Sequence, residues 1–311
     1  MAKLLLGAPV REEIKKDLIS RLKKLHREPL LVIVQVGNRA DSNTYIRNKI
    51  KFGEEVGIKV FLNKFEENIE EEKLIEEITK ISKDGDVNGI IVQLPLPSNI
   101  DSGKVINSIP KNKDADGLTT SPPAPLLAKE RGEENILLVT PATAKAVLSI
   151  FNYYGIPIKS KKIAVVGRSR LAGGPIAELL KSLGGEIETC DRSTQNIKEV
   201  CKNADIIISA AGQIGLIDKS FVKPGQVIID VGINRITPLR SGPIPSSPLT
   251  LRGEPEKTQL VVDINSKPKI VGDVNFEEVE PIVEAITPVP GGIGPLTVAC
   301  LFENLLDLVE K

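Results

Sequence analysis

Several residue types that characterise particular classes of protein are scarce in this 311-residue chain. Tryptophan is absent and aromatic residues make up only 3%, so a surface on which nucleic-acid bases could stack is poorly supplied. Lysine and arginine number 41, as do aspartate and glutamate, which gives a net charge of +0. A balanced charge offers no electrostatic attraction to nucleic acid or to an acidic membrane. We therefore expect no nucleic-acid partner and no membrane partner.

Cysteine and long apolar runs are also in short supply. No apolar run approaches the roughly 20 residues that a bilayer-spanning helix needs, and the apolar run at 4–6 is too brief for a signal peptide. The three cysteines are an odd number without the spacing of metal ligands, which favours free buried thiols and a reducing, cytoplasmic environment. These cysteines are Cys190, Cys201 and Cys300.

Residues that would supply a metal site or an activated nucleophile are missing as well. The only histidine, His26, lies among charged residues at the end of a predicted helix, where a solvent-exposed role is the simpler interpretation. Histidine, cysteine and acidic residues form no cluster with metal-ligand spacing, so we predict no metal site. No GxSxG sequence is present, so a serine nucleophile of the esterase type is not expected.

Apolar runs alternate with amphipathic stretches along most of the chain, which predicts an α/β fold. The length suits about two domains. We predict an N-terminal catalytic domain over 1–139, joined by the C-terminal helix 289–311, and a Rossmann-like nucleotide-binding domain over 140–288 with an insertion at about 235–270. The predicted strands are 30–36, 89–94, 162–166, 186–190, 205–209 and 226–231, and the predicted helices are 11–27, 41–57, 69–82, 141–154, 174–183, 196–202 and 295–309.

A glycine loop follows one predicted strand and precedes a helix, an arrangement suited to binding a phosphate group. It covers 167–175, and its glycines let backbone amides approach a ligand at the positive end of the helix. The spacing differs from the common GxGxxG, so a tight strand–helix turn explains the loop equally well when it is taken alone. Arg168 and Arg170 add positive charge, and the next strand ends at Asp191, twenty-four positions after Gly167, where ribose recognition usually occurs.

The strand end that would meet the ribose carries groups of both signs. Asp191 would hydrogen-bond a free 2′-hydroxyl and favour NAD, whereas Arg192, with Arg168 and Ser169, would bind a 2′-phosphate and favour NADP. Three basic or donor groups against one carboxylate favour NADP, and NAD stays the alternative.

Four short segments carry the residues of a candidate chemical site. Tyr45 and Lys49 are four residues apart in a predicted helix and share one face, although a lysine extending from the edge of an amphipathic helix would also explain the pair. Gln93 lies at the C-terminal end of a predicted strand, where α/β sheets bind ligands. Asp116 lies in a polar loop with two acids, which taken alone is more simply explained as a turn. The run 287–297 has three prolines and three glycines, which predicts a shaped loop before a buried helix rather than a plain linker.

Together these segments resemble the bifunctional methylenetetrahydrofolate dehydrogenase/cyclohydrolase family, over nearly the whole chain and in the family's order. The resemblance implies two α/β domains with a cleft between them and a homodimer formed through the nucleotide domains. It also implies tetrahydrofolate derivatives as substrates, NADP as cofactor and a place in one-carbon metabolism that serves purine biosynthesis. The matching segments are 42–45 with Lys49, 57–58, 89–97, 114–117, 165–175, 204–212, 230–234, 272–274 and 287–297.

The resemblance also implies a role for each candidate residue. Lys49 is the central catalytic group, Tyr45 stacks on the pterin, and Gln93 holds Lys49 and the reacting part of the ring. Asp116 binds the pterin edge, because a carboxylate can accept hydrogen bonds from an amino group and a ring N–H side by side. The residues implied to line the folate site are Pro290, Gly291 and Gly292, and those implied for the cofactor site are Gly167, Arg168, Ser169, Gly173, Arg192 and Ile233.

Two reactions in sequence are implied by the same resemblance. A hydride leaves the one-carbon bridge of 5,10-methylenetetrahydrofolate for NADP+, and water then opens the resulting 5,10-methenyl cation to 10-formyltetrahydrofolate. Burial and the neighbouring cation should both lower the pKa of Lys49. We hypothesise that its neutral amine assists the attack of water and then passes a proton to the opening ring.

The chain departs from the family at three places. It reads Pro-Ala-Thr-Ala at 141–144 where the family commonly has Pro-Cys-Thr-Pro, its segment 121–125 differs from the usual stretch with asparagine and glycine, and its insertion after Arg235 is unusually long. Five prolines within 238–255 predict that the insertion is a surface loop or a partly mobile hairpin. The alternatives are a dehydrogenase-only member of the family, another two-domain NAD(P)-dependent dehydrogenase such as one acting on shikimate, and a catalytically silent nucleotide-binding module.

Overall fold

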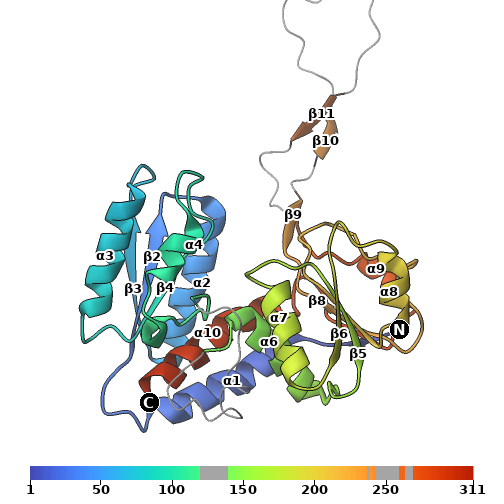
Figure 1. Ribbon diagram of the computed structural model, residues 1–311, viewed down its shortest axis with the longest axis horizontal. Helices are drawn as coiled ribbons and strands as arrows, with labels where there is room; N and C mark the ends of the chain where they lie inside the picture. Colours follow the sequence, from blue (N-terminus) through green and yellow to red (C-terminus); the bar gives the residue numbers. More distant parts are fainter. Residues whose placement is uncertain (120–138, 237–238, 243–258, 263–268, 311) are drawn as a thin grey trace, which may run out of the picture.

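The structure of the protein, a computed structural model, describes residues 1–119, 139–236, 239–242, 259–262 and 269–310. Two parallel sheets, one of three strands and one of six, stand apart from each other, and helices pack on their faces (Figure 1). Two long helices run along the same end of both sheets. The chain therefore has two α/β units connected by helices.

The smaller sheet has the strand order β3-β2-β4, and every pair in it is parallel. Side chains of its central strand alternate between two apolar cores: Leu31 and Ile33 face one core, and Val32 and Val34 face the other. A strand covered on both faces reads as a continuous apolar run, which is why its bounds could be predicted. The elements of this unit are β2 (Leu30–Val36), α2 (Ala40–Val56), β3 (Lys59–Phe65), α3 (Glu71–Lys83), β4 (Gly89–Val92), α4 (Ser102–Asn107) and the 3-10 turn η1 (Lys111–Lys113).

The larger sheet has the order β1-β13-β8-β7-β5-β6 and is also parallel throughout. Its first strand comes from the N-terminus of the chain, which then crosses to the smaller sheet. The strands are β1 (Lys3–Leu4), β5 (Lys162–Val166), β6 (Glu186–Cys190), β7 (Ile206–Ser209), β8 (Val227–Asp230) and β13 (Ala285–Ile286), and the helices are α6 (Ala142–Tyr154), α7 (Gly173–Ser182), α8 (Ile197–Asn203) and α9 (Phe276–Val279).

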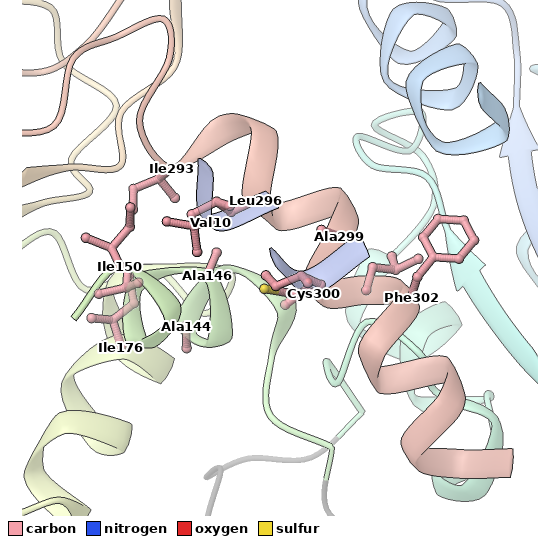
Figure 2. Close-up of a cluster of buried hydrophobic side chains, with 14 of the residues drawn as sticks. Val10, Ala144, Ala146, Ile150, Ile176, Ile293, Leu296, Ala299, Cys300 and Phe302 are labelled. Carbon is pink, nitrogen blue, oxygen red and sulfur yellow. The ribbon is translucent and has the colours of Figure 1, made fainter. Parts of the chain in front are cut away.

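Helices α1 (Gly7–Leu22) and α10 (Gly294–Val309) pack against each other and join the two units. Figure 2 shows Leu296 of α10 beside Val10 of α1, with Ala146 and Ile150 of α6 in the same buried cluster. At the other end, the Phe302 ring meets the Phe52 ring of α2 edge-on, with 5.3 Å between centroids. Helix α10 thus contacts α1 and α2 as well as α6.

The structure also departs from the predicted elements. Helix α1 begins earlier than the predicted 11–27, because Pro9 is tolerated in a first turn, where its missing N–H needs no partner. It also ends earlier, at Leu22, where Lys23 and Lys24 form a turn. The insertion contains two antiparallel strand pairs that extend away from the body, which confirms the hairpin (Figure 1). The pairs join β9 (Asn234–Ile236) to β12 (Lys269–Val271) and β10 (Leu239–Gly242) to β11 (Gln259–Val262). Residues 237–238, 243–258 and 263–268 of the insertion, and the segment 121–125, lie outside the described residues.

Candidate active site

A cavity of about 410 Å³ lies between the two units. One wall comes from α2, a second from the loop that precedes α10, and a third from residues 230–233 after β8. Five of the predicted site residues line this cavity, namely Tyr45, Ile233, Pro290, Gly291 and Gly292. The structure thus gathers the predicted stacking residue, the shaped loop and one predicted cofactor residue around a single space.

Lys49 lies one turn along α2 from Tyr45 and points to the end of β4. Its Nζ donates a hydrogen bond to Gln93 Oε1 at 3.0 Å. The Gln93 side chain is only 9% exposed, and its Nε2 donates to the Leu94 carbonyl at 2.8 Å. That second bond fixes the orientation of the amide, so the carbonyl oxygen faces the amine. The structure brings together the lysine and the glutamine that the sequence placed on separate elements.

Burial shifts the pKa of Lys49 and that of Asp116 in opposite directions. Desolvation lowers the pKa of Lys49, and the nearby Asp116 carboxylate works against that decrease. Desolvation raises the pKa of Asp116, and the Lys49 ammonium works against that increase. Desolvation therefore favours the neutral form of both groups, and the charged form of each favours the charged form of the other. This agrees with the expected decrease in the Lys49 pKa.

The loop that carries Asp116 is shaped by the neighbouring carboxylate of Asp114. Asp114 is 2% exposed and accepts hydrogen bonds from the Gly117 amide at 2.9 Å and the Thr119 amide at 2.7 Å. Gly117 has a φ of 72°, in the left-handed region that favours glycine. Sequence reasoning treated 113–118 as a polar loop and missed this role, although Asp-x-x-Gly is a typical signal for such a side-chain-closed turn.

The loop 287–294 is held against the start of α1. The Gly7 amide donates to the Gly291 carbonyl at 2.8 Å, and the Gly292 amide donates to the Pro288 carbonyl at 2.7 Å. Gly291 has a φ of 116°, which residues with a side chain rarely adopt. A β-carbon on Gly7 would overlap the Gly292 carbonyl oxygen. The loop therefore has a fixed, closely packed shape, as its proline and glycine content predicted.

The glycine loop after β5 is packed as closely. The Gly167 amide donates to the Cys190 carbonyl at 2.8 Å, and a β-carbon on Gly173 would overlap the Gly167 carbonyl oxygen. These glycines let strand, loop and helix come together, and Arg168 within the loop supplies a cationic donor, while Arg192 follows the end of the neighbouring strand β6. A glycine loop at a helix start with an arginine beside it suits the phosphates of a dinucleotide.

The ribose end of this site contains an ion pair. Arg168 Nη1 lies 2.8 Å from Asp191 Oδ2, and Asp191 also accepts hydrogen bonds from the Ser193 amide at 2.9 Å and the Ser193 hydroxyl at 2.6 Å. The Ser193 bonds, followed by Arg168, hold the pKa of Asp191 below its ordinary value. Arg170, in contrast, turns its guanidinium towards the other unit rather than towards the glycine loop.

Two buried acids that sequence reasoning did not single out fix the loops beside the cavity. Asp273 is fully buried and accepts hydrogen bonds from the Ala211 amide at 2.7 Å and the Gly212 amide at 3.0 Å. Asp230 accepts from the Gly232 amide at 2.9 Å, and burial raises the pKa of Asp230 to about 7. Both lie in segments that matched the family, which was the only available signal for them.

Other features of the described residues bear on earlier expectations. All three cysteines are free and buried. In the described ranges, no three His, Cys, Asp or Glu side chains are grouped so that they could hold a metal ion. Among the described helices, none has both the length and the apolar character that a membrane span needs.

Comparisons with known proteins agree with this geometry. The tetrahydrofolate dehydrogenase/cyclohydrolase catalytic domain matches residues 5–116, and the NAD(P)-binding domain of the same family matches 141–311. The bifunctional protein FolD of Acetivibrio thermocellus is 40% identical over 99% of this chain and 97% of its own length, and that of Agathobacter rectalis is 37% identical over 99% and 97%.

Solved structures give the same result. The FolD enzyme of Campylobacter jejuni has a TM-score of 0.83 and 33% identity, covering 100% of this chain and 99% of that one. The Trypanosoma brucei FolD, solved with NADP cofactor and an inhibitor, has a TM-score of 0.82 and 31% identity over 99% and 97% of the two chains. The predicted two-domain α/β fold is confirmed. The chain belongs to the tetrahydrofolate dehydrogenase/cyclohydrolase family.

Proposed function

We propose that the protein oxidises 5,10-methylenetetrahydrofolate with NADP+ and then hydrolyses the 5,10-methenyl product to 10-formyltetrahydrofolate. The observation that carries this proposal is the Lys49–Gln93 hydrogen bond of 3.0 Å, beside Asp116 and one helical turn from Tyr45 at the cavity. Membership of a family whose two domains match nearly the whole chain supports both activities. The roles of individual residues are part of the proposal.

The residues of the nucleotide-binding unit suit NADP. The backbone around Gly167 and Gly173 would accept the diphosphate, and Arg168, Ser169 and Arg192 would hold the 2′-phosphate. The match to an NAD(P)-binding domain and the relative solved with NADP support this choice. When bound, the nicotinamide ring accepts the hydride of the first reaction.

The catalytic unit would orient the folate and move a proton. Tyr45 offers a flat ring for the pterin, and Asp116 accepts hydrogen bonds from the pterin edge. In the second reaction a carbon–oxygen bond forms to water and the bond from the one-carbon unit to the ring nitrogen breaks. One water proton passes through neutral Lys49 to that nitrogen, and the other leaves to solvent. Gln93 keeps the amine in place throughout.

One experiment separates this function from its alternatives. Purified protein is incubated with methylenetetrahydrofolate and either NADP+ or NAD+, and the methenyl and formyl products are followed separately. Both products with NADP+ are expected. Accumulation of the methenyl product alone would indicate a dehydrogenase-only enzyme, and no reduced cofactor would refute the proposal. Lys49→Gln should lose formyl production, whereas Lys80→Gln, at an exposed lysine of α3, should not.

The same proposal includes a homodimer, a cytoplasmic location, a supply of formyl groups for purine biosynthesis, and domain boundaries at 1–139 and 140–288. Strand β6 supports the dimer, because it lies at one edge of the described sheet and pairs only with β5, which leaves its other backbone edge for pairing. The free buried cysteines support a reducing compartment. Thr189→Pro in β6 should convert a dimer to a monomer in light scattering, and a monomeric wild type would refute this part.

A further inference from the structure

Arg170 connects the glycine loop of the nucleotide-binding unit to the catalytic unit. Its Nη2 donates to the Asn107 side-chain oxygen at 3.0 Å and to the Leu118 carbonyl at 3.3 Å. Its Nη1 lies so close to α4 that a β-carbon on Gly103 would be 3.2 Å from it. One guanidinium therefore reaches both the end of α4 and the loop that follows Asp116.

The second of these contacts lies beside the residue proposed to bind the pterin. Leu118 is two positions after Asp116 in the same turn. The turn is also held from the core, where Asn304, which is fully buried, donates to the Ala115 carbonyl at 3.1 Å. Asn304 holds the turn whether or not a ligand is present, whereas Arg170 is exposed and belongs to a loop that would contact the cofactor.

We propose that Arg170 is a positioning residue that couples cofactor binding to folate binding; this inference rests on the proposed function. A cofactor that fixes the glycine loop also fixes Arg170, whose two hydrogen bonds then hold the Asp116 turn in its binding shape. By thermodynamic reciprocity, folate on Asp116 strengthens cofactor binding by the same factor. Both hydrogen bonds of Arg170 come from Nη2 and go to the catalytic unit, so its assigned role is to position the Asp116 turn rather than to bind the cofactor phosphates directly.

The test measures both affinities and their coupling in the full-length protein. Calorimetry gives the dissociation constants of NADP+ and of tetrahydrofolate, each alone and in the presence of the other; this pair lacks the one-carbon group and does not react. In the wild type each ligand should tighten the other by about fivefold or more. Arg170→Gln should reduce that factor to near one while the dissociation constant of NADP+ alone stays within about twofold.

Steady-state kinetics provide a second readout. Arg170→Gln should raise the KM for methylenetetrahydrofolate by about three- to tenfold, the effect of one or two hydrogen bonds, with a smaller change in kcat. Arg170→Lys should recover part of the loss. Asn107→Ala should also raise the KM, because it removes one acceptor of Arg170, but by less than Arg170→Gln, because the Leu118 contact remains. The matched control is Arg27→Gln, which removes an exposed arginine contact to the Gly85 carbonyl at 3.4 Å within one unit. It should change neither KM nor coupling.

Opposing results are clearly distinguishable. Weakened binding of NADP+ alone with intact coupling would make Arg170 a cofactor ligand and overturn the inference, as would wild-type behaviour of Arg170→Gln in every measurement. A wild-type protein that reduces NADP+ with methylenetetrahydrofolate but shows no coupling would overturn this inference and leave the proposed function standing. A wild type that binds no folate would overturn the proposed function itself.

Discussion

Replacing Gly7 with alanine should damage the folate site through the backbone alone. Gly7 is the first residue of α1, and its amide donates to the Gly291 carbonyl at 2.8 Å. An added β-carbon would overlap the Gly292 carbonyl oxygen and lie 3.3 Å from the Gly291 oxygen. Both neighbours are backbone atoms of the shaped loop, so no side chain can rotate away. Either the loop or the start of the helix has to move.

The size of the effect follows from the overlap. Restoring an ordinary contact requires a shift of roughly 1 Å. Such overpacking costs about 1–3 kcal/mol of folding free energy, and each kcal/mol lowers Tm by about 2–4 °C in a large domain. A displacement of that size in a ligand-positioning loop can cost about 100-fold in kcat/KM. The catalytic loss should therefore exceed what the loss of folded protein explains.

The assay compares Gly7→Ala with Gly85→Ala. A β-carbon on Gly85 has nothing within 4 Å, so this control changes the same atoms without a clash. We expect a Tm decrease of several degrees and a large fall in kcat/KM for methylenetetrahydrofolate only in Gly7→Ala. A wild-type Tm in that variant would refute the packing argument. A lower Tm with full activity well below the unfolding temperature would show that the 287–294 loop does not form the folate site.

Three further predictions concern charged groups of the site. Hydrolysis of the methenyl compound should increase as pH rises through the lowered pKa of Lys49, and Lys49→Arg should be inactive because guanidinium keeps its proton; a rate that is flat from acid to alkaline pH would contradict this. Asp116→Asn removes the carboxylate that favours the ammonium form of Lys49, so the acidic limb of the pH profile of hydrolysis should move to lower pH. The KM for folate should rise by about 10- to 100-fold. An unmoved acidic limb would argue against coupling between Asp116 and Lys49. Asp191→Asn should free Arg168 and raise the ratio of kcat/KM for NADP+ to that for NAD+; an unchanged or lower ratio would place the 2′-phosphate elsewhere.

Sequence patterns predicted strands that are buried on both faces or clearly bounded by turn residues. Strands β2 and β5 are buried, have the predicted bounds and end directly before Gly37 and Gly167, whose φ values are positive. Strand β6 also has the predicted bounds although it is an exposed edge strand, because Gly184 and Gly185 precede it and Asp191 follows it. Strand β3 was missed because it is an edge strand whose residues are exposed or half-buried, so it lacks a clear apolar run. Strands β1 and β13 have two residues each, too few for any periodicity.

The candidate site was predictable only where it lies on one element. Tyr45 and Lys49 are related by helix geometry, so their common face follows from the sequence. Their meeting with Gln93 depends on how α2 packs on the smaller sheet, and only the family resemblance indicated it. Asp273 and Asn304 gave no signal of their own, because single buried polar residues that accept or donate to distant backbone groups have no sequence spacing to detect.

The hydrogen bond from Lys49 to Gln93 explains how one amine can serve a step in which its charge changes. A direct ion pair with a carboxylate would stabilise the ammonium form and oppose release of its proton. An amide carbonyl accepts a hydrogen bond from either form, so Gln93 can orient Lys49 before and after the proton moves. Burial and a bound methenyl cation both favour the neutral amine, which is the form that can accept a proton from water. When water attacks, the methenyl cation loses its charge and no longer repels the ammonium form of Lys49. The Asp116 carboxylate still favours that form. Lys49 therefore gains affinity for a proton at the stage when it must take one from water.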